Sequence, residues 1–255
     1  MHDIQNETDT RGIELDRVGI SGLRYPIYFE DGYLRQEGVA DIEVTVRLQH
    51  DRRGTHMSRM VALVHDHLQR FDPRQLPNLL KTGAHLLDAP AFTVEVSMPI
   101  STTVVAPASG HESKQVHDVR VEGQWNDGAV TVTTAVTTDV TSLCPCSKAI
   151  SDYGAHNQRS RITLAVSGHG DTPYPLPVQS AVRLLSSSAS APVIPLVKRT
   201  DERVLTMQAY DHPVFVEDMA RNVSLVCRER GLRHRVSVRN LESIHSHDAV
   251  AYVAG

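Results

Sequence analysis

The chain has 255 residues, of which 40% are hydrophobic and 22% charged, and its formal net charge at pH 7 is −4, from 26 Lys and Arg against 30 Asp and Glu. Its length fits one large domain or two modules of ordinary size. No segment approaches the roughly 20 consecutive apolar residues of a membrane-spanning helix, and the acidic balance argues against a general binder of nucleic-acid phosphates. We therefore expect a soluble globular protein that binds neither a membrane nor nucleic acid.

The N-terminal stretch MHDIQNETDTRGIELD is polar and acidic, unlike a secretory signal or an Arg-rich transit peptide. The three cysteines of the chain are too few for a disulfide framework. We expect a cytoplasmic location with reduced thiols.

The first half of the chain carries the pattern of two strands, two helices and two further strands. Alternation of apolar and polar residues over residues 42–48 predicts a half-buried antiparallel strand that pairs with the Tyr- and Ile-rich stretch before it. Two helices are predicted next, one capped by Thr55 and one beginning at Pro77. The apolar side of the first helix is predicted to consist of Met57, Val61, Val64 and Leu68. Alternation returns over residues 92–100 and 119–121, which predicts two more strands.

The order of elements then repeats after a hairpin signal, NDG, at residues 126–128. Alternating residues over 130–140 and 162–166 predict two strands. Three helices are predicted to follow, starting at Pro177, at Thr200 as a cap and at Pro213. Gly231 is expected to end the last helix, and two strands close the chain.

Two similar halves account for this order, with residues 1–126 as a first module and 127–255 as a second. The predicted fold class is α+β, with two antiparallel sheets that carry helices on one face. Neither sheet is predicted to close on itself, and unpaired edges are a liability unless another subunit covers them. We therefore expect a homo-oligomer.

The stretch TSLCPCSKAISDYGAHNQRS, residues 141–160, places Cys144 and Cys146 one residue apart and His156 ten residues after the second. Thiolate and imidazole are ligands that zinc prefers, but structural zinc sites need four ligands. Cys227 lies in an apolar helical pattern typical of a core residue. A site with fewer protein ligands keeps a position for water, which is the catalytic pattern, with a His or carboxylate from elsewhere as third ligand. A redox pair or packed thiols, with His156 only hydrogen-bonded, also fit the spacing.

This stretch resembles the signature of the prokaryotic type IB GTP cyclohydrolases. Four further blocks resemble that family in order along the chain, from Asp3 to Ala249: DIQNETDTRGIELDRVGISGLRYPI, GTHMSR, VFVEDMARNV and NLESIHSHDA. The resemblance implies the tunnelling fold, used twice per chain as ββααββ, with sheets that assemble across the subunits of a homotetramer into barrels and active sites at subunit interfaces. It also implies GTP as substrate, hydrolysis at C8 with release of formate, and formation of 7,8-dihydroneopterin triphosphate for tetrahydrofolate biosynthesis.

The resemblance implies that Cys144 and His156 are catalytic residues that bind a divalent metal, Zn²⁺, Mn²⁺ or Fe²⁺. Glu202 resembles a carboxylate in or next to the metal shell. An acidic residue in the first turn of a helix also stabilises the helix dipole without any further role, so both interpretations of Glu202 stay open. Cys146 either tunes or replaces Cys144.

Glu217 resembles the residue that anchors the guanine, and one carboxylate can accept hydrogen bonds from both N1–H and the 2-amino group of the base. The alternative for Glu217 is an ordinary ion pair on a helix surface with Arg221, four residues on. Lys148 and Arg159 lie in a locally basic stretch and are the predicted contacts of the triphosphate.

Glu242, His245 and His247 lie together in NLESIHSHDA. In an extended segment His245 and His247 point the same way, and two imidazoles can move protons near neutral pH. The resemblance implies a catalytic acid/base role for the two histidines and makes Glu242 an alternative metal ligand, whereas composition alone describes an exposed loop.

Three other functions fit parts of the sequence. Other tunnelling-fold enzymes of pterins and purines include a nitrile reductase that uses a cysteine nucleophile. A non-catalytic, metal-stabilised nucleotide-binding protein would use Cys144 and His156 for structure only. A thiol redox protein would pair Cys144 with Cys146.

Overall fold

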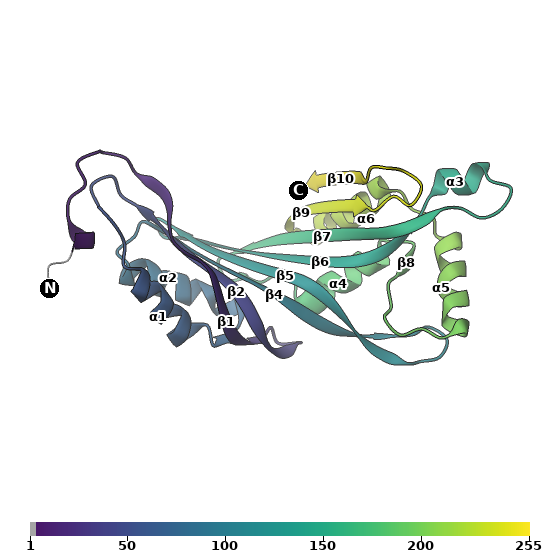
Figure 1. Cartoon of the computed structure of the whole chain (residues 1–255), viewed down its shortest axis with the longest axis horizontal. Helices are drawn as coiled ribbons and strands as arrows, with labels where there is room; N and C mark the ends of the chain where they lie inside the picture. The colour runs from purple at the N-terminus through teal and green to yellow at the C-terminus, as the bar shows by residue number, and fades with distance from the viewer. Residues whose placement is uncertain (1–3) are drawn as a thin grey trace. The chain divides into compact units, whose positions relative to one another are not determined.

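The computed structural model describes residues 4–255, so the first three residues of the predicted first module lie outside the described part (Figure 1). The strands are β1 (Leu15–Glu30), β2 (Arg35–Leu48), β3 (Arg70–Phe71), β4 (Ala91–Val105), β5 (Glu112–Asn126), β6 (Ala129–Leu143), β7 (Asn157–His169), β8 (Ala191–Pro192), β9 (Arg233–Asn240) and β10 (Ala249–Ala254). The α-helices are α1 (Met57–His67), α2 (Leu76–Leu86), α3 (Pro145–Ile150), α4 (Val178–Ser187), α5 (Arg199–Asp211) and α6 (Val216–Glu229). Short 3₁₀ helices cover Ile4–Asn6 and Pro73–Gln75.

The strands form one sheet in the order β10-β9-β7-β6-β5-β4-β2-β1-β3, with β8 beside β6. The pairs β1–β2, β2–β4 and β9–β10 are antiparallel. The prediction of two separate sheets is wrong, because the NDG hairpin makes β5 and β6 neighbours. Asp127 (φ 48°) and Gly128 (φ 93°) both have the positive φ of a type I′ turn, as the hairpin signal predicts. The α+β class with an antiparallel sheet and accompanying helices is confirmed.

The chain packs as two compact units. The first consists of the described residues up to Met98, with Arg120–Thr134 and Ser167–Pro175, and the second of Pro99–Val119, Ala135–Val166 and Leu176–Gly255. The proposed repeat boundary at residue 126 concerns the order of elements along the chain and stays a prediction. Within the described residues, no helix is both long and apolar enough to cross a membrane.

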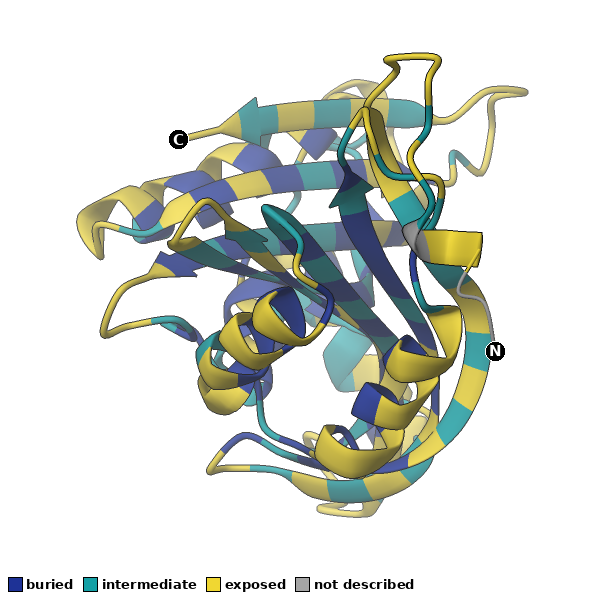
Figure 2. Cartoon of the chain, turned by 90° about the vertical axis from the view of Figure 1, so that its left-hand side faces the viewer, coloured by how far each residue is buried: buried dark blue, intermediate teal, exposed yellow. Residues whose placement is uncertain are grey.

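The strand faces follow the predicted alternation. In β4, for example, Phe92, Val94 and Val96 are buried, while the residues that alternate with them are more accessible. The buried sides of the helices face the strands and their exposed sides face away (Figure 2). Burial of these alternating apolar residues is the main contribution to stability.

Helix α1 departs from its predicted face. Its buried residues are Met60, Leu63 and Val64, whereas Met57 and Val61 are 46% and 40% exposed. The buried stripe is therefore rotated around the helix axis relative to the predicted one. Thr55 is not the cap, because the helix begins at Met57 with His56 as its N-cap residue.

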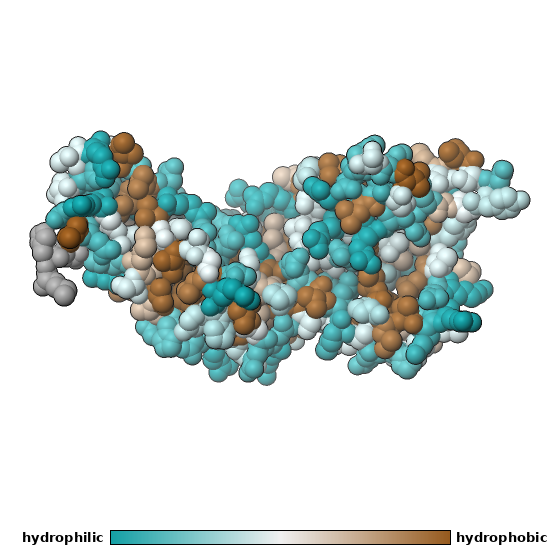
Figure 3. Space-filling view, in the orientation of Figure 1, coloured by the Kyte–Doolittle hydropathy of each residue, from teal (hydrophilic) through white to brown (hydrophobic). Residues whose placement is uncertain are grey.

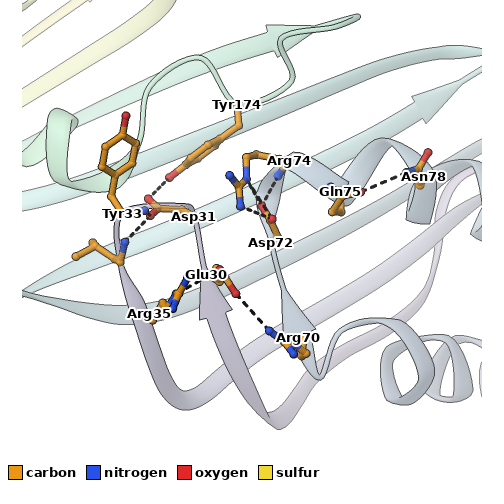
Figure 4. A network of polar contacts seen from close by, with 11 residues as sticks. Glu30, Asp31, Tyr33, Arg35, Arg70, Asp72, Arg74, Gln75, Asn78 and Tyr174 are labelled. Atoms are coloured by element: carbon orange, nitrogen blue, oxygen red, sulfur yellow. Dashed lines mark hydrogen bonds and ion pairs between the residues drawn. The ribbon is translucent and has the colours of Figure 1, made fainter.

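A buried carboxylate closes the β1–β2 connection of the first unit (Figure 4). Asp31 is 2% exposed, and its Oδ1 accepts hydrogen bonds from the backbone N–H groups of Tyr33 (3.0 Å) and Leu34 (2.8 Å). The Tyr174 hydroxyl donates to its Oδ2 at 2.8 Å. Asp31 thus joins a tight turn to a residue far away in sequence.

The helices of the second unit begin at different residues from those predicted. The N-cap residue of α5 is Lys198 rather than Thr200, and the Asp201 carboxylate accepts the Lys198 N–H at 2.8 Å. Helix α6 begins at Val216 rather than next to Pro213, because the Asp218 carboxylate accepts the N–H of the preceding residue, Phe215, at 3.0 Å. In both helices an acidic residue at the third position supplies the cap. Gly231, at φ 65°, ends α6 as predicted.

Candidate active site

A cavity of about 310 Å³ lies in the second unit, lined by the ends of β6, β7 and β9, by α3 and by the start of α6. Six residues predicted from sequence line it: Cys144, His156, Glu217, Glu242, His245 and His247. Cys146 lines it as well. Segments that are up to about a hundred residues apart therefore supply one site.

Cys144 and His156 are held close together by backbone hydrogen bonds. Cys144 is the N-cap residue of α3, and its Sγ accepts the Ser147 N–H at 3.4 Å. Its own N–H donates to the His156 carbonyl at 3.0 Å, while the His156 N–H donates to Ser147 Oγ at 3.2 Å. Ser147 therefore contacts both predicted metal ligands.

Glu242 and His245 lie beside His156, and His247 lies beside His245. Glu242 Oε2 lies 4.0 Å from His156 Nδ1, and the rings of His156 and His245 meet edge to face with centroids 6.3 Å apart. The segment between β9 and β10 has no regular strand geometry, so the extended conformation considered for it does not form. The rings of His245 and His247 nevertheless stack, with centroids 5.2 Å apart and an interplanar angle of 18°.

Glu217 is the second residue of α6 and is exposed to the cavity. The alternative ion pair with Arg221 does not form, because Arg221 pairs with Asp218 at 3.6 Å instead. The Glu217 carboxylate makes no hydrogen bond or ion pair with any residue from 4 to 255. Its carboxylate is therefore available to a ligand.

Three predicted residues do not line the cavity. The Lys148 ammonium donates to the Tyr210 carbonyl and lies 4.1 Å from the centre of the Tyr210 ring, a cation–π contact. Arg159 is exposed on β7 and follows the buried Gln158, so strand alternation turns its side chain to the other face. Glu202 lies in the first turn of α5, about 12 Å along the helix axis from Tyr210, the residue that meets α3.

Three buried polar residues that also line the cavity, Ser142, Gln158 and Asn240, were missed from sequence. Gln158 Oε1 lies 2.9 Å from His156 Nδ1, and Gln158 in turn contacts Ser142, which also contacts Asn240. Ser142, Gln158 and Asn240 are at most 7% exposed. The available signal was their position, since each is a polar residue at an inward-facing place in a strand.

The donor set of the cavity fits a divalent metal by type, because thiol sulfur, imidazole nitrogen and carboxylate oxygen are all ligands of zinc. Within the described residues, no three His, Cys, Asp or Glu side chains are close enough together to hold an ion as they stand. Gln158 at Nδ1 of His156 resembles the outer partner that a metal-bound histidine usually has. Cys144 and His156 are joined through a backbone hydrogen bond, and the Glu242 carboxylate lies 4.0 Å from His156.

The arrangement of elements is shared with an enzyme of known structure. The uricase from Arthrobacter globiformis superposes with a TM-score of 0.53 at 10% sequence identity, covering 94% of this chain and 92% of the uricase. The fold is therefore of the tunnelling type that the signature blocks implied.

Sequence comparison then identifies the family. The chain matches the type I GTP cyclohydrolase folE2 family over residues 1–251. It is 41% identical over 253 residues to the GTP cyclohydrolase FolE2 of Herminiimonas arsenicoxydans, covering 98% of this chain and 95% of that protein. The GTP cyclohydrolase FolE2 of Neisseria gonorrhoeae is 40% identical over 254 residues, covering 99% and 97%. The chain belongs to the type I GTP cyclohydrolase folE2 family, and the resemblance stated from its sequence is confirmed.

Proposed function

We propose that this protein is a GTP cyclohydrolase I, which hydrolyses GTP at C8 of the guanine, releases formate and forms 7,8-dihydroneopterin triphosphate, a precursor of tetrahydrofolate. The observation that carries the proposal is the cavity of the second unit. It gathers two thiols, three imidazoles and two carboxylates in a chain that matches the family over residues 1–251. Nucleophile activation, base recognition and proton transfer each have a matching group there.

The guanine is held by Glu217. This carboxylate is exposed to the cavity, and a carboxylate can accept from N1–H and from the 2-amino group at once. Adenine presents no such pair of donors on that edge, so the contact also selects the base.

Cys144 and His156 would hold the divalent metal, with Glu242 as the adjacent carboxylate. When bound there, such an ion would lower the pKa of a water molecule toward neutrality and would supply hydroxide for the attack on C8. Thiolate and imidazole favour zinc, whereas a site with a carboxylate accepts manganese or iron. Glu202 stays a predicted metal ligand. For Glu202 to reach the metal, the start of α5 would have to come from another subunit or to move.

His245 and His247 would give and take protons while the purine ring opens and the ribose rearranges. Both are exposed at the cavity, stacked on each other, and His245 also meets the ring of His156. Imidazoles suit this task because they exchange protons near neutral pH.

We further propose a cytoplasmic homotetramer of tandem tunnelling-fold modules with active sites between subunits. Strand β10 ends the sheet, and its Tyr252 is 72% exposed. Apolar side chains also reach the surface around α3 (Figure 3), where Ile150 and Tyr153 are 85% and 95% exposed. A neighbouring subunit would cover such surfaces. Lys148 and Arg159, which do not line the cavity of their own chain, would contact the triphosphate from such an interface.

The deciding experiment incubates metal-stripped protein with GTP, with and without Mn²⁺ or Zn²⁺, and follows formate together with pterin fluorescence after mild oxidation. The proposal expects both products, in equal amounts and only with metal. Neither product with any metal would overturn it, and tight GTP binding without turnover would then identify a nucleotide-binding protein.

A further inference from the structure

In the wall of the cavity lies a chain of buried polar side chains on three neighbouring strands, of which Ser142, Gln158 and Asn240 line the cavity. Ser142 is the last residue but one of β6, Gln158 and Ser160 lie near the start of β7, and Asn240 ends β9. Their exposed fractions are 0% for the two serines, 7% for Gln158 and 3% for Asn240. Polar groups this deeply buried need hydrogen-bond partners, so each of their donors and acceptors can be assigned.

The assignment starts at a group that can only accept. Ser142 Oγ lies 3.0 Å from the Val214 carbonyl, so the serine proton points to that oxygen. The serine oxygen must then accept its other two contacts, from Gln158 Nε2 and Asn240 Nδ2, each at 3.4 Å. Asn240 agrees with this orientation, since its Oδ1 accepts the Ser160 hydroxyl at 2.6 Å.

The orientation of Gln158 decides the tautomer of His156. With its amide nitrogen on Ser142, Gln158 presents Oε1 to His156 Nδ1 at 2.9 Å. The second oxygen near Nδ1 is the carboxylate Oε2 of Glu242, at 4.0 Å, which is also an acceptor. Nδ1 must therefore carry the proton, and the lone pair of the neutral ring lies on Nε2.

We propose that Ser142, Gln158 and Asn240 form one positioning unit, which holds His156 in the Nδ1–H tautomer with the Nε2 lone pair free for a metal ion. The inference rests on the proposed function only in naming a metal as the partner of Nε2. Gln158 is a positioning residue here, since it acts through His156.

The same unit connects His156 to the other parts of the site. Val214, whose carbonyl accepts the hydrogen bond from the Ser142 hydroxyl, lies three residues before Glu217. Asn240 lies two residues before Glu242. One buried hydroxyl thus links the histidine to the segments that carry the guanine anchor and the nearest carboxylate.

The test uses metal-free, full-length protein labelled with ¹⁵N in histidine. Long-range ¹H–¹⁵N spectra distinguish an Nδ1–H from an Nε2–H ring, and His156 is assigned by its loss in His156→Gln. We expect Nδ1–H for His156 in the wild type. Gln158→Met, which keeps the side-chain volume but removes the acceptor, should shift His156 toward Nε2–H and weaken Zn²⁺ binding by about 10- to 100-fold in a chelator competition. Gln158→Glu, which keeps an acceptor, should retain the wild-type tautomer.

Ser142→Ala should produce part of the Gln158→Met effect, because the amide then loses the contact that fixes its orientation. Ser224→Ala is the matched control: Ser224 is a buried serine, 4% exposed, whose hydroxyl lies 2.8 Å from His234 Nε2, and it does not line the cavity. An Nε2–H ring in the wild type, or a Gln158→Met protein with unchanged tautomer and Zn²⁺ affinity within twofold, would overturn the inference. Neither readout uses GTP, so a wild type that binds zinc as expected but makes no formate would refute the proposed function alone.

Discussion

The Asp201 carboxylate accepts both the backbone N–H and the hydroxyl of Ser109, at 2.8 and 2.7 Å, although the two residues are 92 positions apart. The same carboxylate accepts the N–H groups of Ala108 and Lys198, and it is fully buried. Burial by itself would raise the pKa of Asp201, but these hydrogen bonds outweigh it and hold the pKa below its usual range. Asp201 thereby fixes the β4–β5 connection to the start of α5.

We therefore predict that acid destabilises the protein partly through Asp201. Because its pKa is lower folded than unfolded, its contribution to the free energy of unfolding is complete above the ordinary value of 3.8 and is lost as the pH falls through the lowered pKa. Asp201→Asn should lower Tm at pH 7, and its difference from wild type should shrink toward pH 3. Thermal scans across this range test the prediction, with the exposed Asp211→Asn as control; parallel Tm curves for wild type and Asp201→Asn would contradict it.

A second pH effect is predicted from His117, which is 1% exposed between Thr102 Oγ1 at 2.8 Å and Thr138 Oγ1 at 2.9 Å. Burial lowers its pKa, while the charges of Asp118 and Asp139 oppose this less strongly. As the pH falls below about 6.5, His117 becomes protonated in the unfolded chain while it stays neutral in the folded chain. The free energy of unfolding therefore decreases. Urea unfolding at pH 7.5 and 5.5 should show a smaller decrease for His117→Gln than for wild type, and equal decreases would argue against this role.

The two cysteines of the motif should differ in function. Cys144 accepts a hydrogen bond from the Ser147 N–H at the start of α3, next to His156, whereas Cys146 is exposed. Cys144→Ala should reduce formate release by about two orders of magnitude or more while Tm stays close to wild type, because a metal ligand is lost. Cys146→Ala should retain activity within a few-fold. The reverse ranking of the two variants would assign the ligand role to Cys146.

Base recognition by Glu217 can be measured with an analogue that lacks one donor. Inosine triphosphate has N1–H but no 2-amino group, so the wild type should prefer GTP in kcat/KM by about tenfold or more, the value of one charge-assisted hydrogen bond. In Glu217→Ala the KM for GTP should rise and this preference should disappear. Arg221→Ala serves as control, since Arg221 pairs with Asp218 on the helix surface. A preference for GTP that survives in Glu217→Ala would place the guanine elsewhere.

How far the sequence predicts this fold depends on how local each signal is. Alternation places the strands correctly because burial repeats every second residue along them. The helix starts near Thr200 and Pro213 are misplaced because the caps come from Asp201 and Asp218, inside the helices. The single sheet forms because β5 and β6 pair across the hairpin. The periodicity of residues within each half of the chain carries no information about that pairing.

For the site, the signature stretch and its companion blocks lead to Cys144, His156, Glu217 and the C-terminal histidines, and the structure brings these into one cavity. The residues that were missed include Ser142 and Asn240, which contact each other although they are 98 positions apart in the sequence. No spacing rule encodes such a contact, because it depends on which strands become neighbours.

The turn at Asp127 and Gly128 also limits where this chain can be lengthened. Only two residues join β5 to β6, so one added residue there would offset the pairing of these two strands. Such a slip would carry Val132, Val136 and Val140 from the core to water. Tags, reporters or circularly permuted ends therefore belong in other exposed connections. The connection between β9 and β10 is suitable only when catalytic activity is not needed.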